Sequence, residues 1–207
     1  IPVPTSYMAV NSKYDFGGGY EEHIDAGMLH VADHHVNAGK KQWTWGHGDF
    51  GQAWDRNLTD EDGPYIELMT GMYCDNQPDF AWLQPYEEKT WKQYFMPYQT
   101  VGMVKNATKE AMVNVVESGG RFKVMAYATG VYDQARVILK DKVSGRLLMD
   151  RTVNISPFQS FVAEIETGGT LQENIELAVY DSMARVLVRY SAVKKEDKPI
   201  PEPAKAA

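Results

Sequence analysis

The sequence predicts an all-β protein, and two observations carry that prediction. The last hundred residues are short runs of alternating apolar and mixed positions that end at turn residues. The first hundred residues are aromatic segments punctuated by glycines, in which helix formers rarely run long enough for a stable helix. A chain of 207 residues is long enough for two domains with cores of their own.

The first half, residues 1–104, is expected to be irregular β structure with long loops. Residues 42–45 and 91–95 are aromatic enough to be strands, and the turn residues 62–64 precede a strand over residues 65–69. Alternation in that strand puts Tyr65 and Glu67 on one face and Ile66 and Leu68 on the other. Cys74 is the only cysteine, so no intramolecular disulfide can hold these segments together.

The second half, residues 105–193, is predicted to be an immunoglobulin-like β-sandwich. Its strands are spaced by roughly 8 to 12 residues, which is typical of that architecture. Turns are expected at residues 118–120, 144–145 and 167–170. Strands are expected at residues 122–127, 135–139, 161–165, 175–180 and 186–190. This half contains neither histidine nor tryptophan, so it is expected to support or pack against the first half.

The chain ends in a charged, proline-rich segment, residues 194–207, which is expected to be a linker to a further domain in a longer parent protein. The start at Ile1, without a methionine, favours the same view. The net charge of −7 argues against nucleic acid as a partner, because phosphate binding needs a basic patch. No apolar run approaches the roughly 20 residues of a membrane helix, so we expect a soluble protein without a membrane partner.

All five histidines and all five tryptophans lie between His23 and Trp91, among carboxylates and glycines. Flat apolar rings beside acidic hydrogen-bonding groups suit a polyhydroxylated ring, so the distribution points to a carbohydrate site. The alternative is that the aromatic side chains fill a β core and the carboxylates keep the surface hydrated. Composition alone does not separate the two interpretations. No phosphate-binding glycine loop, serine-hydrolase elbow or paired cysteine motif is present, and no cofactor is expected.

A histidine-rich segment covers residues 30–35. In a helix, His30 and His34 would lie on one face and could bind zinc, but Val31 stands where a metalloprotease motif has glutamate, so no metal site is predicted. In a strand, His30 and His34 would share one face while Asp33 and His35 point to the other. Each histidine could contact a sugar hydroxyl or be hydrogen-bonded within the fold.

Glu67 is the leading candidate for acid–base chemistry. It alternates with apolar neighbours in the predicted strand, and glycoside hydrolysis uses a pair of carboxylates. Asp60, Asp62 and Asp79 are possible partners, while an exposed strand carboxylate remains the alternative for Glu67. The loop at residues 75–79 carries short polar side chains next to Phe80 and Trp82 and could read hydroxyl groups, or could simply form a capped turn.

Four segments resemble a bacterial domain family of unknown function: GKKQWTWG at residues 39–46, FGQAWD at 50–55, LTDEDGPYIEL at 58–68 and DNQPDFAWL at 75–83. That family is found in large proteins with tetratricopeptide repeats and has a galactose-mutarotase-like supersandwich fold. The resemblance covers roughly residues 4–106, too few for a complete supersandwich. It implies that residues 1–104 are the C-terminal part of one, and that the remainder of the parent chain, or a separate fragment of it, is a partner.

The resemblance further implies a carbohydrate-processing protein, with members that act on β-linked glucosides. Glu67 and Asp62 become the likeliest catalytic carboxylates. The residues implied to contact an oligosaccharide or monosaccharide are Trp43, Trp45, Trp54, His34, His35, Asp75, Asn76 and Gln77. Two alternatives stay open: a non-catalytic carbohydrate-binding or structural module, and a mutarotase in which a histidine acid faces a glutamate base. A bacterial cytoplasm or periplasm is the expected location, and no metal or cofactor is expected. Because the preceding strands are absent, the fragment alone is expected to be inactive.

Overall fold

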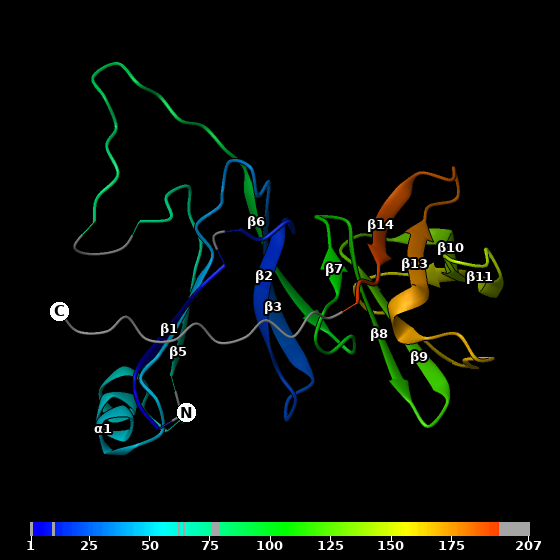
Figure 1. Ribbon diagram of the computed structural model, residues 1–207, viewed down its shortest axis with the longest axis horizontal. Helices are drawn as coiled ribbons and strands as arrows, with labels where there is room; N and C mark the ends of the chain where they lie inside the picture. The colour runs from blue at the N-terminus through cyan, green and yellow to red at the C-terminus, as the bar shows by residue number, and fades with distance from the viewer. Residues whose placement is uncertain (1, 10, 62, 64, 76–78, 195–207) are drawn as a thin grey trace.

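The structure is a computed structural model that describes residues 2–9, 11–61, 63, 65–75 and 79–194. Three of the predicted site residues, Asp62, Asn76 and Gln77, lie outside the described residues, as does the predicted linker beyond Lys194. The chain forms two β-rich halves that lie side by side (Figure 1). Four antiparallel sheets make up nearly all of the regular structure, so the prediction of an all-β fold is confirmed.

The first half contains two three-stranded antiparallel sheets. One has the order β1-β4-β5, and the other has the order β2-β3-β6. The strands of the first sheet are β1 (Thr5–Met8), β4 (Lys41–Thr44) and β5 (Ile66–Met69). Those of the second sheet are β2 (Phe16–Glu21), β3 (Ala26–Ala32) and β6 (Gln93–Gln99). The strand expected over residues 65–69 is therefore present, one residue shorter than predicted.

Gly27 allows neighbouring strands of the second sheet to lie close together. A Cβ on Gly27 would lie 2.5 Å from a ring carbon of Tyr98 and 2.6 Å from the carbonyl oxygen of Gly19. Real Cβ atoms do not approach backbone oxygens this closely. Gly27 on β3 therefore keeps β2, β3 and the Tyr98 ring of β6 in contact.

The expectation that the first half lacks a stable helix is wrong. Helix α1 (Asp49–Leu58) has ten residues, with Asp49 in its first turn and Arg56 in its last, where both charges complement the helix dipole. A helix this short is marginal by propensity alone, and tertiary contact stabilises it. Trp54 stacks on Trp45, which precedes the helix, with ring centroids 5.0 Å apart and an interplanar angle of 14°.

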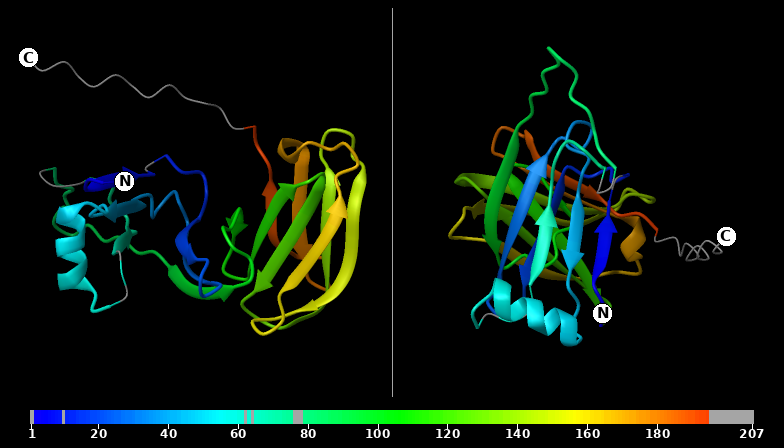
Figure 2. Two further views of the ribbon diagram at one scale, coloured as in Figure 1. Left: turned by 90° about the horizontal axis from the view of Figure 1, so that it is seen from below. Right: turned by 90° about the vertical axis from the view of Figure 1, so that its left-hand side faces the viewer.

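The second half is a β-sandwich of two four-stranded antiparallel sheets that face each other (Figure 2, left). The order of one sheet is β12-β9-β8-β7, and that of the other is β11-β10-β13-β14. The first consists of β7 (Asn106–Ala107), β8 (Ala111–Ser118), β9 (Arg121–Ala128) and β12 (Phe161–Glu166). The second consists of β10 (Tyr132–Asp141), β11 (Leu147–Ile155), β13 (Ile175–Tyr180) and β14 (Val186–Ser191), with a 3₁₀ turn, η1 (Gln172–Asn174), before β13.

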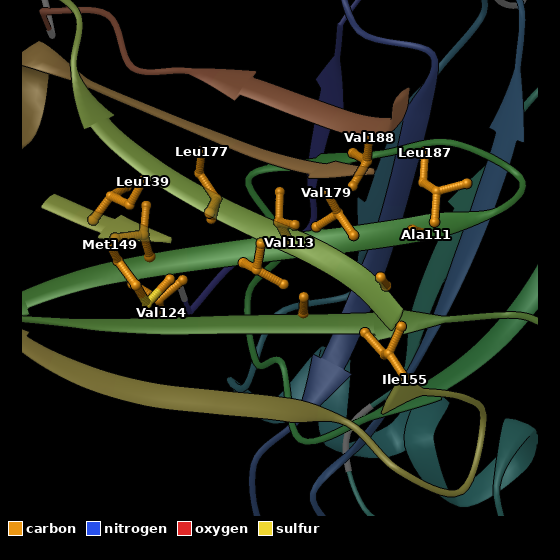
Figure 3. Packing of buried hydrophobic residues seen from close by; sticks show 14 of the residues in the cluster. Ala111, Val113, Val124, Leu139, Met149, Ile155, Leu177, Val179, Leu187 and Val188 are labelled. Carbon is orange, nitrogen blue, oxygen red and sulfur yellow. The ribbon is translucent and has the colours of Figure 1, made fainter. Parts of the chain in front are cut away.

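The core of the sandwich is built from alternate residues of the facing sheets (Figure 3). On β8 and β9, Val113 and Val124 point inward and are fully buried, and on the opposite sheet Leu139 and Leu177 are fully buried as well. All five predicted runs in this half fall within strands. Strands β7, β8 and β11 were not among these runs. The sequence of β11, LLMDRTVNI, places two charged residues in the middle of the run.

A second apolar cluster joins the two halves. It combines Leu29, Val31, Met96 and Tyr98 from β3 and β6 with Met112, Met125 and Tyr127 from the outer face of β8 and β9. Met112 is fully buried there, although its strand neighbour Val113 points into the sandwich core. The sheet β2-β3-β6 is therefore covered on one face by the sandwich and faces the sheet β1-β4-β5 on the other. Within the described residues, no helix has both the length and the apolar character to cross a bilayer.

Candidate functional site

Strands β4 and β5 bring a tryptophan and a carboxylate together. Trp43 and Glu67 are direct partners in the antiparallel register, so their side chains lie on the same face of the sheet. Glu67 is half-buried, whereas its neighbours Ile66 and Leu68 remain 52% and 49% exposed. The indole Nε1 of Trp43 is buried without a hydrogen-bond partner. The register of β4 and β5 thus brings a candidate tryptophan beside the candidate carboxylate.

Two further candidate tryptophans, Trp45 and Trp54, stack on each other between the end of β4 and helix α1. Strand β4 ends at Thr44, so Trp45 lies just beyond it and stacks against Trp54, with Phe50 tilted against both rings. Trp54 remains 37% exposed. We call Trp43, Trp45, Trp54 and Glu67 the Trp–Glu surface. Its rings come from a strand, the segment after it and a helix.

The helix also positions the start of β5. The Asp55 carboxylate accepts a hydrogen bond from the backbone N–H of Tyr65 at 3.0 Å, just before that strand begins. Thr59, which follows the helix, donates its hydroxyl to the Gly63 carbonyl at 3.0 Å. These bonds tie α1 to the segment that leads into Glu67. The helix that sequence reasoning missed is therefore part of the support of the predicted site.

Asp75 lies near the other end of β4. Its backbone carbonyl accepts a hydrogen bond from Lys41 Nζ at 2.7 Å, and its side chain is exposed. This contact holds the start of the 75–79 loop against the strand that carries Trp43. Of the predicted sugar contacts in this loop, only Asp75 belongs to the described residues.

The strand considered for residues 30–35 covers only the first part of that segment. Strand β3 ends at Ala32, and the two histidines occupy the turn that follows it. The turn forms because the Asp33 carbonyl accepts the N–H groups of Val36 and Asn37, at 3.1 and 2.8 Å. Among the contacts of the described residues, none joins either histidine to Trp43 or Glu67. The structure thus separates these histidines from the Trp–Glu surface.

His30 belongs to a buried polar cluster between the two sheets of the first half. Its imidazole lies within 3.2 Å of Gln93 Oε1, Asn37 Nδ2 and Thr70 Oγ1. Asn37 is fully buried, and its Oδ1 has no hydrogen-bond partner. Burial lowers the pKa of His30 below its ordinary value, so this imidazole is neutral at pH 7. Sequence reasoning considered His30 only with His34, and nothing local could show that Asn37 and Thr70 surround it.

Lys40 is the second buried titratable group beside this cluster. It is 7% exposed, its ammonium group donates to the Tyr14 carbonyl, and burial lowers its pKa. His30 and Lys40 line a cavity of about 160 Å³ together with apolar side chains that include Met28 and Phe95. Leu68 also lines this cavity, so the alternation along β5 turns Glu67 to the opposite face of the sheet.

A wider groove of about 750 Å³ runs between the same two sheets. It is lined by Gly18 and Gly19 of β2, by Met28 on β3 and, on the facing sheet, by Gln42, Ile66 and Leu68. The half-exposed apolar side chains of β5 therefore border a groove and do not form a closed core. The first half offers two surfaces for a ligand: this inter-sheet space and the Trp–Glu surface on the other face of β4 and β5.

Two family models match separate parts of the chain. Residues 3–98 match a domain of unknown function (DUF5107), and residues 106–190 match the second domain of YphG-like proteins. The first half is thus similar to an uncharacterised domain family. The prediction of a family of unknown function is confirmed to that extent, while the supersandwich fold and the tetratricopeptide-repeat parent stay predictions. No solved structure matches the chain.

Proposed function

We propose that this chain recognises a carbohydrate through the Trp–Glu surface, as part of a protein that hydrolyses or transfers β-linked glucosides. The observation that carries the proposal is the cross-strand pair of Trp43 and Glu67. An aromatic ring offers the apolar face of a sugar a flat partner, and the adjacent carboxylate accepts hydrogen bonds from its hydroxyl groups. The Trp45–Trp54 stack continues the aromatic area toward α1.

In the catalytic form of the proposal, Glu67 is the acid–base residue. A half-buried carboxylate beside an indole is partly shielded from water, which is the setting in which enzymes use a carboxyl group as a general acid. Glycoside hydrolysis requires a second carboxylate, and the proposal assigns that part to Asp62 by the resemblance stated above. The proposal includes the predicted supersandwich and a longer parent, whose remaining strands would complete the site.

A second candidate is a carbohydrate-binding module without catalysis. The packing of Trp45, Trp54 and Phe50 favours it, because a group of packed rings can bind the apolar face of a sugar without proton transfer. In that case the carboxylate contributes a hydrogen bond and no proton transfer. The two candidates differ in what happens when the acid is removed and the rings are kept.

Isothermal titration with gluco- and galacto-oligosaccharides, followed by product analysis on the same mixtures, tests the proposal. Glu67→Gln keeps the size and hydrogen-bonding ability of the side chain and removes its charge. Glu164→Gln is the matched control, since Glu164 is an exposed strand carboxylate on β12 in the other half. Turnover that is lost only in Glu67→Gln supports catalysis. Binding that survives in Glu67→Gln, with no turnover by the variant or by the wild-type chain, supports the binding module. Absence of binding by the wild-type chain contradicts both candidate functions.

A further inference from the structure

The turn after β3 gathers three side chains with metal-binding atoms outside the Trp–Glu surface. Asp33, His34 and His35 each offer one donor atom, and these atoms all lie within 4.8 Å of one another. The Nδ1 atom of His35 is 2.9 Å from the Oδ1 atom of Asp33. Two neighbouring ligands of one tetrahedral zinc ion, each bound at about 2.0–2.2 Å, are separated by about 3.3–3.6 Å. The hydrogen-bonded atoms of Asp33 and His35 would therefore need to move apart by only about half an ångström to share one ion.

His34 carries a further feature of metal ligands. Its Nδ1 lies 2.7 Å from Asp15 Oδ1, and the same oxygen accepts the His34 backbone N–H at 2.9 Å. A metal-binding histidine commonly donates its second ring N–H to a carboxylate, which fixes the tautomer and the orientation of the ring. When Nδ1 carries the proton toward Asp15, Nε2 keeps the lone pair that binds a metal. Asp15 comes from the segment before β2, so this contact is not a property of the turn alone.

The turn is held in place before any ion binds. The carbonyl of Asp33 accepts the N–H groups of Val36 and Asn37, and the Ala32 N–H donates to the Asp15 carbonyl at 2.8 Å. Fully buried Asn37 anchors the end of the turn, because its side-chain amide donates to Thr70 Oγ1 at 2.9 Å. The two imidazole rings lie with their centroids 3.9 Å apart. Metal binding therefore requires little further ordering of the turn, so the conformational free-energy cost of binding is small.

We propose that Asp33, His34 and His35 bind a divalent transition-metal ion of the zinc class, with Asp15 as the positioning residue of His34. Two imidazoles and one carboxylate form a donor set that suits Zn²⁺, Co²⁺ and Ni²⁺ better than Ca²⁺ or Mg²⁺, which prefer oxygen ligands. Three protein ligands leave at least one coordination position for water or another molecule.

The surroundings of the turn show what that open position faces. Asp15 and Asp33 line a groove of about 510 Å³ between the two halves, which Trp91 and Tyr94 also border. The side chains of His35 and Asp33 are 77% and 64% exposed, so an ion can reach them from solvent. A bound ion would therefore stand at the edge of an aromatic groove that is separate from the Trp–Glu surface. The proposal does not depend on the carbohydrate function.

Titration of the tag-free, chelator-treated chain with ZnCl₂ tests the site, with Co²⁺ absorption as a second readout of coordination. We expect one zinc ion per chain in a Cys74→Ser background, which removes the only thiol. Replacing His35 by alanine should weaken binding at least tenfold. Asp15→Asn should retain the stoichiometry and weaken binding by roughly 10–100-fold, the usual effect of losing the group that orients a ligand.

His23→Ala is the matched control, because His23 is an exposed histidine that pairs with Glu21 on β2, outside the cluster. It should leave the affinity unchanged. Circular dichroism checks that each variant is folded. We expect His35→Ala to be folded because the His35 side chain is exposed. Equal zinc affinity in the wild-type chain and in both His34→Ala and His35→Ala would overturn the proposal, as would loss of the site in His23→Ala or no zinc binding by the wild type.

Discussion

Replacing Met112 by alanine should destabilise the contact between the two halves. Met112 is fully buried in the cluster that β3 and β6 share with β8 and β9. Truncating a buried methionine to alanine typically costs about 2–5 kcal/mol, because the cavity that remains adds to the lost transfer free energy. With about 3 kcal/mol lost and a urea dependence of about 2 kcal/mol per molar, the unfolding midpoint should fall by about 1.5 M.

The chain contains a natural probe for this experiment. All five tryptophans lie between residues 43 and 91, so tryptophan fluorescence follows only the first half, although Met112 itself belongs to the second. Val143→Ala is the control, since Val143 is 74% exposed in a turn of the second half and should leave the midpoint unchanged. If Met112→Ala shifts the circular dichroism of the sandwich but leaves the fluorescence transition in place, the two halves do not share a stabilising core and the reasoning fails.

Three further substitutions test other parts of the structure. Gly27→Ala should destabilise the first half by about 1–3 kcal/mol in urea unfolding, because its Cβ would collide with the Gly19 carbonyl; an unchanged midpoint would contradict this close approach. His30 has a lowered pKa in the folded state, so the unfolded chain takes up the proton first and stability should fall as the pH drops below about 6.5. Between pH 7.5 and 5.5, His30→Gln should reduce the pH dependence of the free energy of unfolding by up to about 1.4 kcal/mol per pH unit. Identical slopes in the wild-type and variant chains would contradict a lowered pKa for His30. Trp54→Ala should lower the helical circular dichroism signal, because stacking on Trp45 holds α1 in place; full retention of the signal would show that α1 is stable without it.

The second half follows from its sequence more completely than the first. Alternation of apolar and polar residues, such as that around Val124 and Leu177, is a local signal. It predicts a strand without any knowledge of which strand pairs with it. Helix α1 was missed because its stability depends on the contact between Trp54 and Trp45, which is not encoded in helix propensity. Strand β11 was not among the expected strands because the adjacent charged residues Asp150 and Arg151 interrupt its apolar alternation.

Parts of the candidate site could likewise be predicted. The alternation around Glu67 placed it correctly in a strand, but its pairing with Trp43 depends on a register between segments that are 24 positions apart. The histidines show the opposite case. In a strand, His30 and His34 would have shared one face, whereas the chain turns at Asp33 and places His34 and His35 beyond the end of β3. Long-range packing, which decides both outcomes, leaves little trace in the local sequence.

The most direct test of carbohydrate recognition at the Trp–Glu surface is a nuclear magnetic resonance titration of the five tryptophan indole N–H signals. The signals are assigned by single Trp→Phe variants, and a β-linked gluco-oligosaccharide is the ligand. We expect the signals of Trp43, Trp45 and Trp54 to shift with a common affinity, while those of the exposed Trp82 and of Trp91 stay in place. Unchanged indole signals at saturating sugar, or shifts confined to Trp82 and Trp91, would contradict the proposed site.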